Sequence, residues 1–134
     1  MYSESKIVVR YAETDKMGIV HHSVYPIWYE IARTNFIKSI GITYSELEKK
    51  GVMLPLIELT SKYILPANYE DELTIRIKIQ KLTPARIIFG YEIYNKEKLI
   101  NTGTTTHAFV GKNLKPINLK KNMQDIYNKI EELV

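Results

Sequence analysis

The feature of this 134-residue chain that most constrains its fold is a helix-length segment, from Ser23 to Gly41, that is apolar around almost its whole circumference. A helix on a protein surface carries one apolar stripe, whereas this segment has to be covered on most sides. We therefore expect a central helix with Ser23 as its N-cap, Pro26 in its first turn and Gly41 at its end. Its apolar residues are Val24, Tyr25, Ile27, Trp28, Tyr29, Ile31, Ala32, Phe36 and Ile37.

Five segments have the composition and the breaks typical of β-strands. In the third of them, apolar residues from Leu73 to Ile79 alternate with polar ones, which predicts one buried and one solvated face. Short turn segments around Pro66, Pro84 and Lys96 separate the later strands, and such connections favour antiparallel neighbours. The predicted strands are Lys6–Tyr11, Leu54–Leu65, Leu73–Leu82, Arg86–Tyr94 and Leu99–Val110.

Two further helices complete the expected order of elements. The segment from Thr43 to Glu46 has the pattern of a capping box, and the short helix that it starts is closed by Gly51. From Leu119 onward, apolar residues recur at helical spacing and predict a C-terminal amphipathic helix. The order β-α-β-β-β-β predicts an α+β fold in which a curved antiparallel sheet of about five strands encloses one long helix. Because no linker or change in composition divides the chain, we expect residues 1–134 to form one domain.

Composition limits the classes of chemistry and of partner. The chain has no cysteine, so catalysis has to use oxygen or nitrogen groups or an external ion, and no disulfide is expected. The formal net charge of +4 is modest and the lysines concentrate only between Lys112 and Lys121, which is too little for a nucleic-acid platform. A mildly basic surface suits an anionic thioester that bears a nucleotide, although an ordinary solvated surface is the simpler explanation for any single lysine.

No segment approaches the roughly 20 apolar residues that span a bilayer, and the first residues lack the apolar run of a signal peptide. We therefore expect a cytoplasmic protein without membrane insertion.

The loop before the central helix has the layout of an active site. It carries Asp15 and Gly18 just ahead of the helix N-terminus, where free backbone N–H groups and a partial positive charge are exposed. A carboxylate in this place can act as a base or a nucleophile toward a carbonyl group held against those donors. The arrangement predicts acyl transfer.

Plainer explanations for the same residues stay open. Asp15 would otherwise be a helix-capping or surface carboxylate, Gly18 an ordinary turn glycine, and Tyr25 a core residue. Three histidines (His21, His22 and His107) together with Asp15 would form the ligand set of a metal site. Adjacent histidines point in different directions and lack the usual i, i+4 spacing, so we expect no metal and no cofactor.

Two motifs resemble those of the 4-hydroxybenzoyl-CoA thioesterase family, in particular its bacterial acyl-CoA thioesterase branch. The first is Tyr11-x-x-Thr14-Asp15-x-x-Gly18-Ile19-Val20-x-His22-x-x-Tyr25, followed by Tyr29-Glu30-x-Ala32-Arg33. The second is Tyr63-x-x-Pro66-Ala67-x-x-x-Asp71-x-Leu73. The resemblance extends to about Val110 and implies the hotdog fold, with hydrolysis of an acyl-CoA thioester to free acid and CoA.

The resemblance also implies roles for single residues. Asp15 would be the catalytic carboxylate, and the backbone N–H of His22, at the helix N-terminus, would polarise the thioester carbonyl. Gly18, Val20 and Tyr25 would contact the substrate. Arg86 falls near the position from which related proteins bring basic groups to the CoA phosphates, although the sequence around it departs from the family pattern.

Family members pair side by side, so the resemblance implies a homodimer or a tetramer of dimers with sites at the subunit boundary. The segment Leu54–Ser61, which carries Glu58, would then form a wall of the partner's site. Two other functions stay open on the same fold. A dehydratase acting on hydroxyacyl thioesters would use Asp15 with His22, and an acyl-CoA-binding module would keep the pocket without the chemistry.

Overall fold

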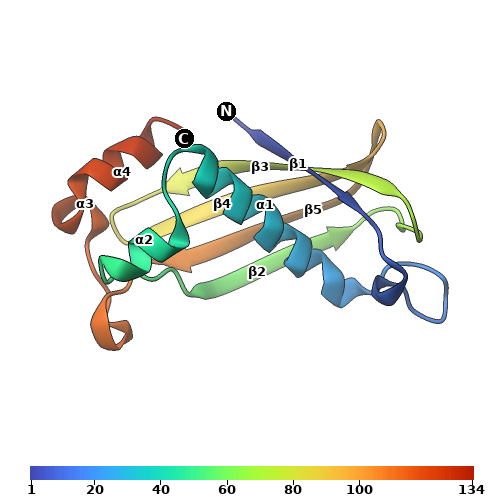
Figure 1. The fold of residues 1–134 in the computed structure, drawn as a ribbon, viewed down its shortest axis with the longest axis horizontal. Coiled ribbons are helices and arrows are strands. Elements are labelled where there is room, and N and C mark those ends of the chain that lie inside the picture. Colours follow the sequence, from blue (N-terminus) through green and yellow to red (C-terminus); the bar gives the residue numbers. More distant parts are fainter.

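The computed structural model describes residues 1–134. One five-stranded sheet with the strand order β1-β3-β4-β5-β2 forms its main layer, and every neighbouring pair is antiparallel (Figure 1). The strands are β1 (Ser3–Val8), β2 (Leu56–Tyr63), β3 (Glu72–Leu82), β4 (Arg86–Asn95) and β5 (Lys98–Ala108). The helices are α1 (Tyr25–Ser39), α2 (Tyr44–Lys49), α3 (Leu119–Asn122) and α4 (Gln124–Glu131), and 3-10 turns cover Tyr11–Glu13, His22–Val24 and Lys112–Leu114.

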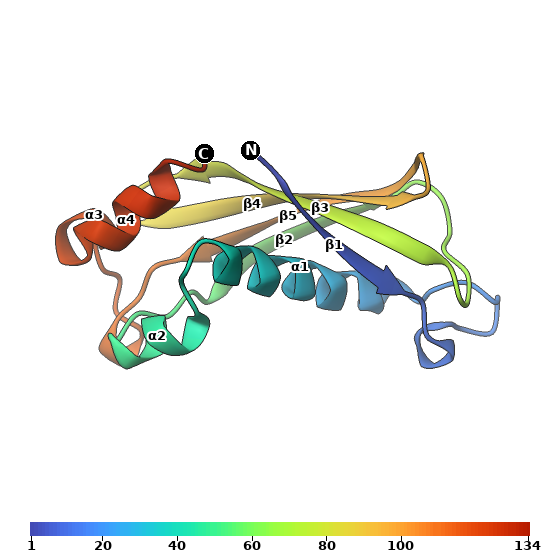
Figure 2. The same cartoon turned by 45° about the horizontal axis from the view of Figure 1, so that its top comes forward.

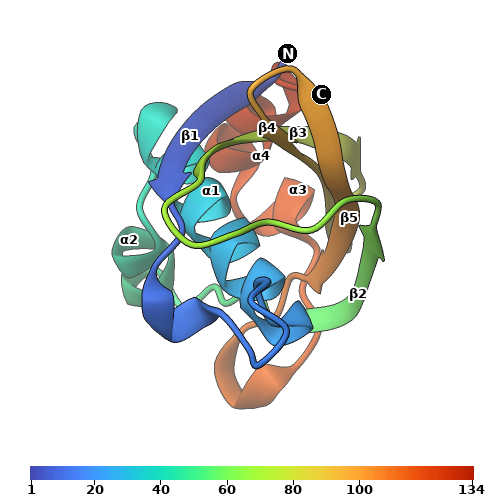
Figure 3. The same ribbon diagram turned by 90° about the vertical axis from the view of Figure 1, so that its right-hand side faces the viewer.

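The sheet curls around α1, which lies along its concave face (Figures 2 and 3). Large side chains of α1 fill this interior, and Trp28, Tyr29 and Phe36 are each at most 1 % exposed. Phe36 meets Phe89 of β4 edge to face, with ring centroids 6.5 Å apart. The predicted α+β class, with a curved sheet around one central helix, is confirmed.

The alternation expected in β3 is also observed. Ile75, Ile77 and Ile79 are buried against α1, whereas Lys78 and Gln80 are exposed on the opposite face. The short helix α2 begins as the capping pattern predicted, because the Thr43 side chain accepts a hydrogen bond from the Glu46 N–H at 3.1 Å.

Three local predictions were wrong. The first strand lies at Ser3–Val8 rather than at 6–11, because residues 11–13 turn into a 3-10 helix that the Glu13 carboxylate closes by accepting the Arg10 N–H. The second error concerns α1, which is not capped by Ser23. Instead the His21 ring accepts the Ser23 N–H at 3.2 Å in a 3-10 turn, and α1 begins at Tyr25.

The third correction concerns the C-terminal helix, which is divided. Met123 has φ −145° and ψ 62°, a conformation outside the helical region, and it separates α3 from α4. Both pieces pack into the main core, α3 through Leu119 and α4 through Ile126 and Ile130. The Leu119 N–H also donates to the Pro84 carbonyl at 2.8 Å. None of the helices has the length and apolar character needed to cross a membrane.

Candidate active site

A closed loop brings the predicted site residues to the N-terminal end of α1. Thr14 pairs with Val20 in an isolated antiparallel bridge, and the Glu13 carbonyl accepts the His21 N–H at 2.9 Å. Inside the loop, the Asp15 N–H donates to the Ile19 carbonyl at 2.9 Å. The loop is therefore a short hairpin whose two arms meet directly before α1.

Gly18 forms the turn of this hairpin. Its N–H donates to the Asp15 carbonyl at 3.0 Å, and its φ of +83° lies in the left-handed region that side-chain-bearing residues rarely adopt. An added Cβ at this position would meet no atom within 4 Å. The glycine is thus required by the conformation of the turn, and the space beside it is open.

The carboxylate of Asp15 is half-buried and carries one internal hydrogen bond. Its Oδ1 accepts the Met17 N–H at 2.8 Å, which orients the group from within its own loop. No Lys, Arg or His side chain forms an ion pair with it. The alternative role as a helix cap does not hold, because the bonded N–H belongs to the loop and not to α1.

The backbone N–H of His22 has no acceptor within the chain. It lies in the 3-10 turn that leads into α1, where the helix dipole adds partial positive charge. The carbonyl of the same residue accepts a hydrogen bond from the Tyr63 hydroxyl at 2.9 Å. Tyr63, the last residue of β2, thereby holds the peptide group that follows His22, next to the one whose N–H is the predicted donor. In the sequence, Tyr63 was noted only as the first residue of the second motif.

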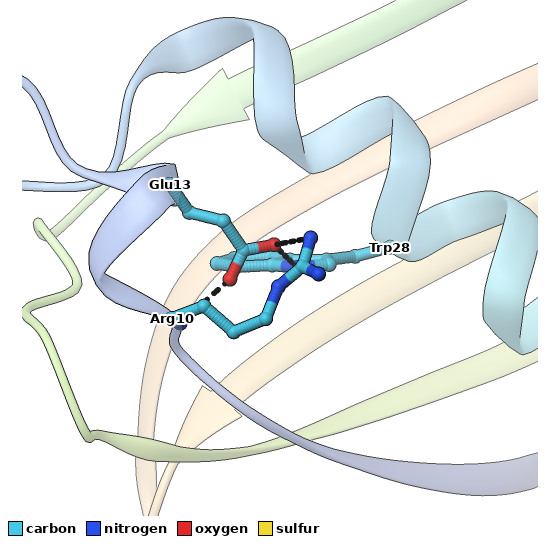
Figure 4. A network of polar contacts seen from close by, with 3 residues as sticks. All are labelled: Arg10, Glu13 and Trp28. Carbon is cyan, nitrogen blue, oxygen red and sulfur yellow. Dashed lines mark hydrogen bonds and ion pairs between the residues drawn. The ribbon is translucent and has the colours of Figure 1, made fainter.

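The carboxylate of Glu13, at the base of the loop, is buried and contacts Arg10 and Trp28 (Figure 4). Glu13 is 6 % exposed, and it accepts the Arg10 N–H at 2.7 Å and the Trp28 indole N–H at 3.1 Å. The Arg10 guanidinium reaches the same carboxylate at 3.4 Å. Sequence reasoning missed Glu13, although an acidic residue two positions before Asp15 was visible in the motif.

Two residues predicted to contact substrate are inside the protein. Val20 is 4 % exposed, and its N–H donates to the Ala67 carbonyl at 2.9 Å. Tyr25 is 2 % exposed, and its ring packs edge-on against Trp28 and Tyr63, at centroid distances of 4.9 Å and 5.0 Å. Burial also raises the pKa of the Tyr25 hydroxyl.

Arg86 and Glu58 do not join Asp15 within one chain. Arg86 begins β4, whose other end, at Asn95, is bonded to Asp71 beside the loop that carries Asp15. A strand of this length spans about 30 Å. Glu58 lies in β2 opposite Thr106 of β5.

The three histidines also do not converge. His107 is 3 % exposed near the start of β2, where it pairs with Leu56, whereas His22 contacts Tyr63 at the other end of that strand. His21 and His22 stack at a centroid distance of 4.2 Å, and both are exposed. The ligand set considered for a metal is therefore spread over two ends of the molecule.

A chain of buried hydrogen bonds runs from α1 through the sheet and was not predicted. Arg33 donates to the Tyr91 hydroxyl at 2.9 Å, Tyr91 contacts Thr105 at 2.6 Å, and Thr105 contacts His107 Nε2 at 3.0 Å. His107 Nδ1 lies 3.1 Å from the Leu54 carbonyl. Because that carbonyl can only accept, Nδ1 carries the proton, Nε2 accepts, and each hydroxyl donates toward His107.

The pKa of His107 agrees with a neutral imidazole in this series of hydrogen bonds. Burial lowers the pKa of His107 to about 4. Tyr29, one helical turn nearer the site than Arg33, is a second buried group. Its hydroxyl contacts both Ser61 and Asn101, and burial raises its pKa to about 12. Gly103 is necessary at this place, because any Cβ would collide with the Tyr29 hydroxyl.

Two large depressions in the surface of the single chain do not include the predicted catalytic residues. Depressions of about 540 Å³ on the outer face of the sheet and about 1240 Å³ beside Glu70–Thr74 are lined by neither Asp15 nor His22. The edge strand β2 reaches the site at its last residue, Tyr63, and it is about half exposed there as well as at Leu56 and Ile57, at its other end.

Comparisons with known proteins agree with this architecture. A family model described as the thioesterase-like superfamily matches residues 9–126. YneP of Bacillus subtilis, by its name a candidate acyl-CoA thioesterase, is 38 % identical over 97 % of this chain and 96 % of its own length. The crystal structure of a DHNA-CoA thioesterase from Staphylococcus aureus superposes with a TM-score of 0.93 at 33 % identity, covering 98 % of this chain and 89 % of that one.

A hypothetical protein from Thermus thermophilus, TT1821, has a TM-score of 0.91 at 34 % identity, with 100 % and 98 % of the two chains covered. These likenesses place the chain among the thioester hydrolases that have the hotdog fold. Within that class it belongs to the thioesterase-like superfamily.

Proposed function

We propose that this enzyme hydrolyses an acyl-CoA thioester with Asp15 as its catalytic carboxylate and the His22 backbone N–H as the donor to the thioester carbonyl. The observation that carries the proposal is the pairing of a carboxylate that has no cationic partner, on the closed hairpin, with a free N–H in the 3-10 turn that joins this hairpin to α1. A negative group and a donor in this arrangement supply the two elements that acyl transfer needs.

The chemistry fits the limited equipment of the site. A thioester is already activated, so a positioned carboxylate and a preorganised donor can suffice without a serine-histidine pair. One oxyanion donor contributes roughly 3 kcal/mol to lowering the barrier. As the carbonyl oxygen gains charge, the His22 N–H and the positive end of α1 stabilise it.

Asp15 has two routes to the same products. In the first, its carboxylate takes a proton from a water molecule that attacks the carbonyl carbon. In the second, it attacks the carbon itself, the C–S bond breaks with release of the CoA thiolate, and the resulting anhydride is opened by water. A single turnover in ¹⁸O-labelled water distinguishes the routes. The nucleophilic route leaves the label in the Asp15 carboxylate when water attacks that side of the anhydride, whereas the general-base route puts it only in the released acid.

CoA is the proposed handle of the substrate. Support comes from the named relatives and from the mildly basic chain, which carries a net charge of +4. The direct test is release of free thiol from a panel of aliphatic, aromatic and 3-hydroxyacyl-CoA thioesters. Thiol release supports the hydrolase, loss of water from the 3-hydroxyacyl member without thiol release supports the dehydratase, and binding without turnover supports a non-catalytic module.

The proposal includes an assembly. The edge strand β2, which ends at the site, exposes apolar side chains along its length, and such an edge is suited to pairing with a second sheet. We propose that residues 1–134 act as one catalytic domain in a homodimer or a tetramer of dimers, with Arg86 at the rim for the CoA phosphates and the segment around Glu58 beside the partner's site. A cytoplasmic location remains a prediction.

A further inference from the structure

Glu13 is the only acidic residue that is buried in this chain. A buried carboxylate is costly unless hydrogen bonds compensate it. Here each oxygen has its own N–H donor, with Arg10 N on Oε1 at 2.7 Å and the Trp28 indole on Oε2 at 3.1 Å (Figure 4). The only nearby cation is the Arg10 guanidinium, whose side chain is 73 % exposed. An acid kept in such a place needs an explanation.

The main chain of Glu13 lies at the base of the hairpin that carries Asp15. Its N–H donates to the Arg10 carbonyl at 3.0 Å, and its carbonyl accepts the His21 N–H at 2.9 Å, so the residue joins both arms of the hairpin. Its side chain meanwhile reaches Trp28, the fourth residue of α1. Through this single residue, the end of β1, the hairpin and the first turn of α1 are tied together.

We propose that Glu13 is the positioning residue of the reaction: its carboxylate, anchored to Trp28, sets the distance between Asp15 and the His22 N–H. This inference rests on the proposed function, because it assigns to Glu13 control of the geometry that the function needs. Asp15 has only its own loop for support, through Met17. Since an error of about 1 Å in placing a reacting group can cost about 100-fold in rate, the anchor has a measurable kinetic role.

The chemistry of the anchor requires a carboxylate and not merely a polar side chain. Two donors approach two different oxygens, so a glutamine could accept only one of them and would turn its amide NH₂ toward the other. The Glu13→Gln variant therefore keeps the size of the side chain and removes one anchoring bond. This makes it a sharper probe than truncation to alanine, which would also leave a cavity.

The first experiment compares steady-state kinetics of Glu13→Gln with those of the wild type on an acyl-CoA that the wild type hydrolyses. We expect kcat per folded enzyme to fall at least about tenfold while KM changes less than about twofold, because binding does not use this residue. Arg10→Ala is the matched control. It removes the exposed guanidinium but keeps the Arg10 N–H, and it should stay within about twofold of the wild type in both constants.

Rates that fall only in proportion to the folded fraction, as measured by near-UV circular dichroism, would overturn the positioning role. So would a folded Glu13→Gln enzyme with the kcat of the wild type.

The second experiment does not depend on catalysis. Trp28 is the only tryptophan, so its indole N–H gives one ¹⁵N-resolved signal. This signal should move further in Glu13→Gln than in Arg10→Ala, which removes only a guanidinium 3.4 Å from the oxygen that accepts the indole N–H. Hydrogen exchange at the amides of Asp15 and Val20 should be faster in Glu13→Gln alone. Unchanged exchange would refute the anchor even if the enzyme is active. A faster exchange in a protein that hydrolyses no thioester would leave the anchor standing and refute the proposed function.

Discussion

At the scale of single residues, two carboxylates two positions apart are held in opposite ways. Glu13 is buried with a donor on each oxygen, whereas Asp15 is half-buried and keeps one oxygen without a partner in the chain. A carboxylate whose hydrogen bonds are complete is fixed in place, while one with a free oxygen is available to a substrate or a water molecule. The roles that we propose for Asp15 and Glu13 rest on these contacts.

His22 separates side-chain chemistry from backbone chemistry. Its imidazole is exposed and bonds to no other group, and only its N–H is assigned to the thioester carbonyl. We expect His22→Ala to keep kcat within about tenfold of the wild type, because the donor and the helix dipole remain. Steady-state kinetics measure this directly. A folded His22→Ala enzyme that binds substrate and has lost at least about 100-fold in kcat would indicate that the imidazole takes part, as the dehydratase alternative requires.

At the scale of elements, the parts of the fold that are coded locally could be predicted. The apolar circumference of α1 and the alternation in β3 identified the core, and the loop with Asp15 was placed at the helix start. The first strand was misplaced by three residues, because the Glu13 carboxylate turns the chain after Val8. The series of buried hydrogen bonds from Arg33 to His107 could not be predicted from the sequence. Most of these bonds join residues that lie 14 to 58 positions apart in the sequence.

The buried His107 in this series of hydrogen bonds predicts that the stability of the fold falls in acid. The pKa of His107 is about 4 in the folded protein and about 6.5 when unfolded, so the unfolded state takes up the proton first as the pH falls. The contribution to stability is complete above about pH 6.5 and is lost progressively down to about pH 4. It is on the order of 2 kcal/mol after allowance for solvent screening.

Urea unfolding at several pH values between 7 and 4 measures this contribution, with His107→Gln as the control. The wild type should lose more of its free energy of unfolding than the variant between pH 6.5 and 5, a range in which carboxylates contribute little. Equal pH slopes for the two proteins would show that His107 is not the source.

At the scale of the whole molecule, three observations support the proposed assembly. Asp15 and His22 line neither of the two large depressions, and Arg86 lies at the far end of β4. The exposed apolar edge of β2 ends at Tyr63, beside the same loop. A second sheet paired along β2 would cover the edge and enclose the site.

The two edges of the sheet allow a matched test of this assembly. Ile57 of β2 and Val8 of β1 are both about half exposed. We expect Ile57→Lys to shift sedimentation equilibrium at micromolar concentration from dimer or tetramer toward monomer and to lower kcat, because a charge would have to be buried at the contact. Val8→Lys should change neither quantity. A wild type that is a fully active monomer at this concentration would remove the shared-site model.

The most direct test of the catalytic role proposed for Asp15 is the kcat of Asp15→Asn on an acyl-CoA that the wild type hydrolyses. The substitution keeps the shape of the side chain, and its oxygen can still accept the Met17 N–H, while the charge and the basicity are lost. We expect a fall in kcat of at least about 100-fold, with circular dichroism and CoA binding unchanged. A folded Asp15→Asn enzyme that keeps kcat within about tenfold of the wild type would contradict it.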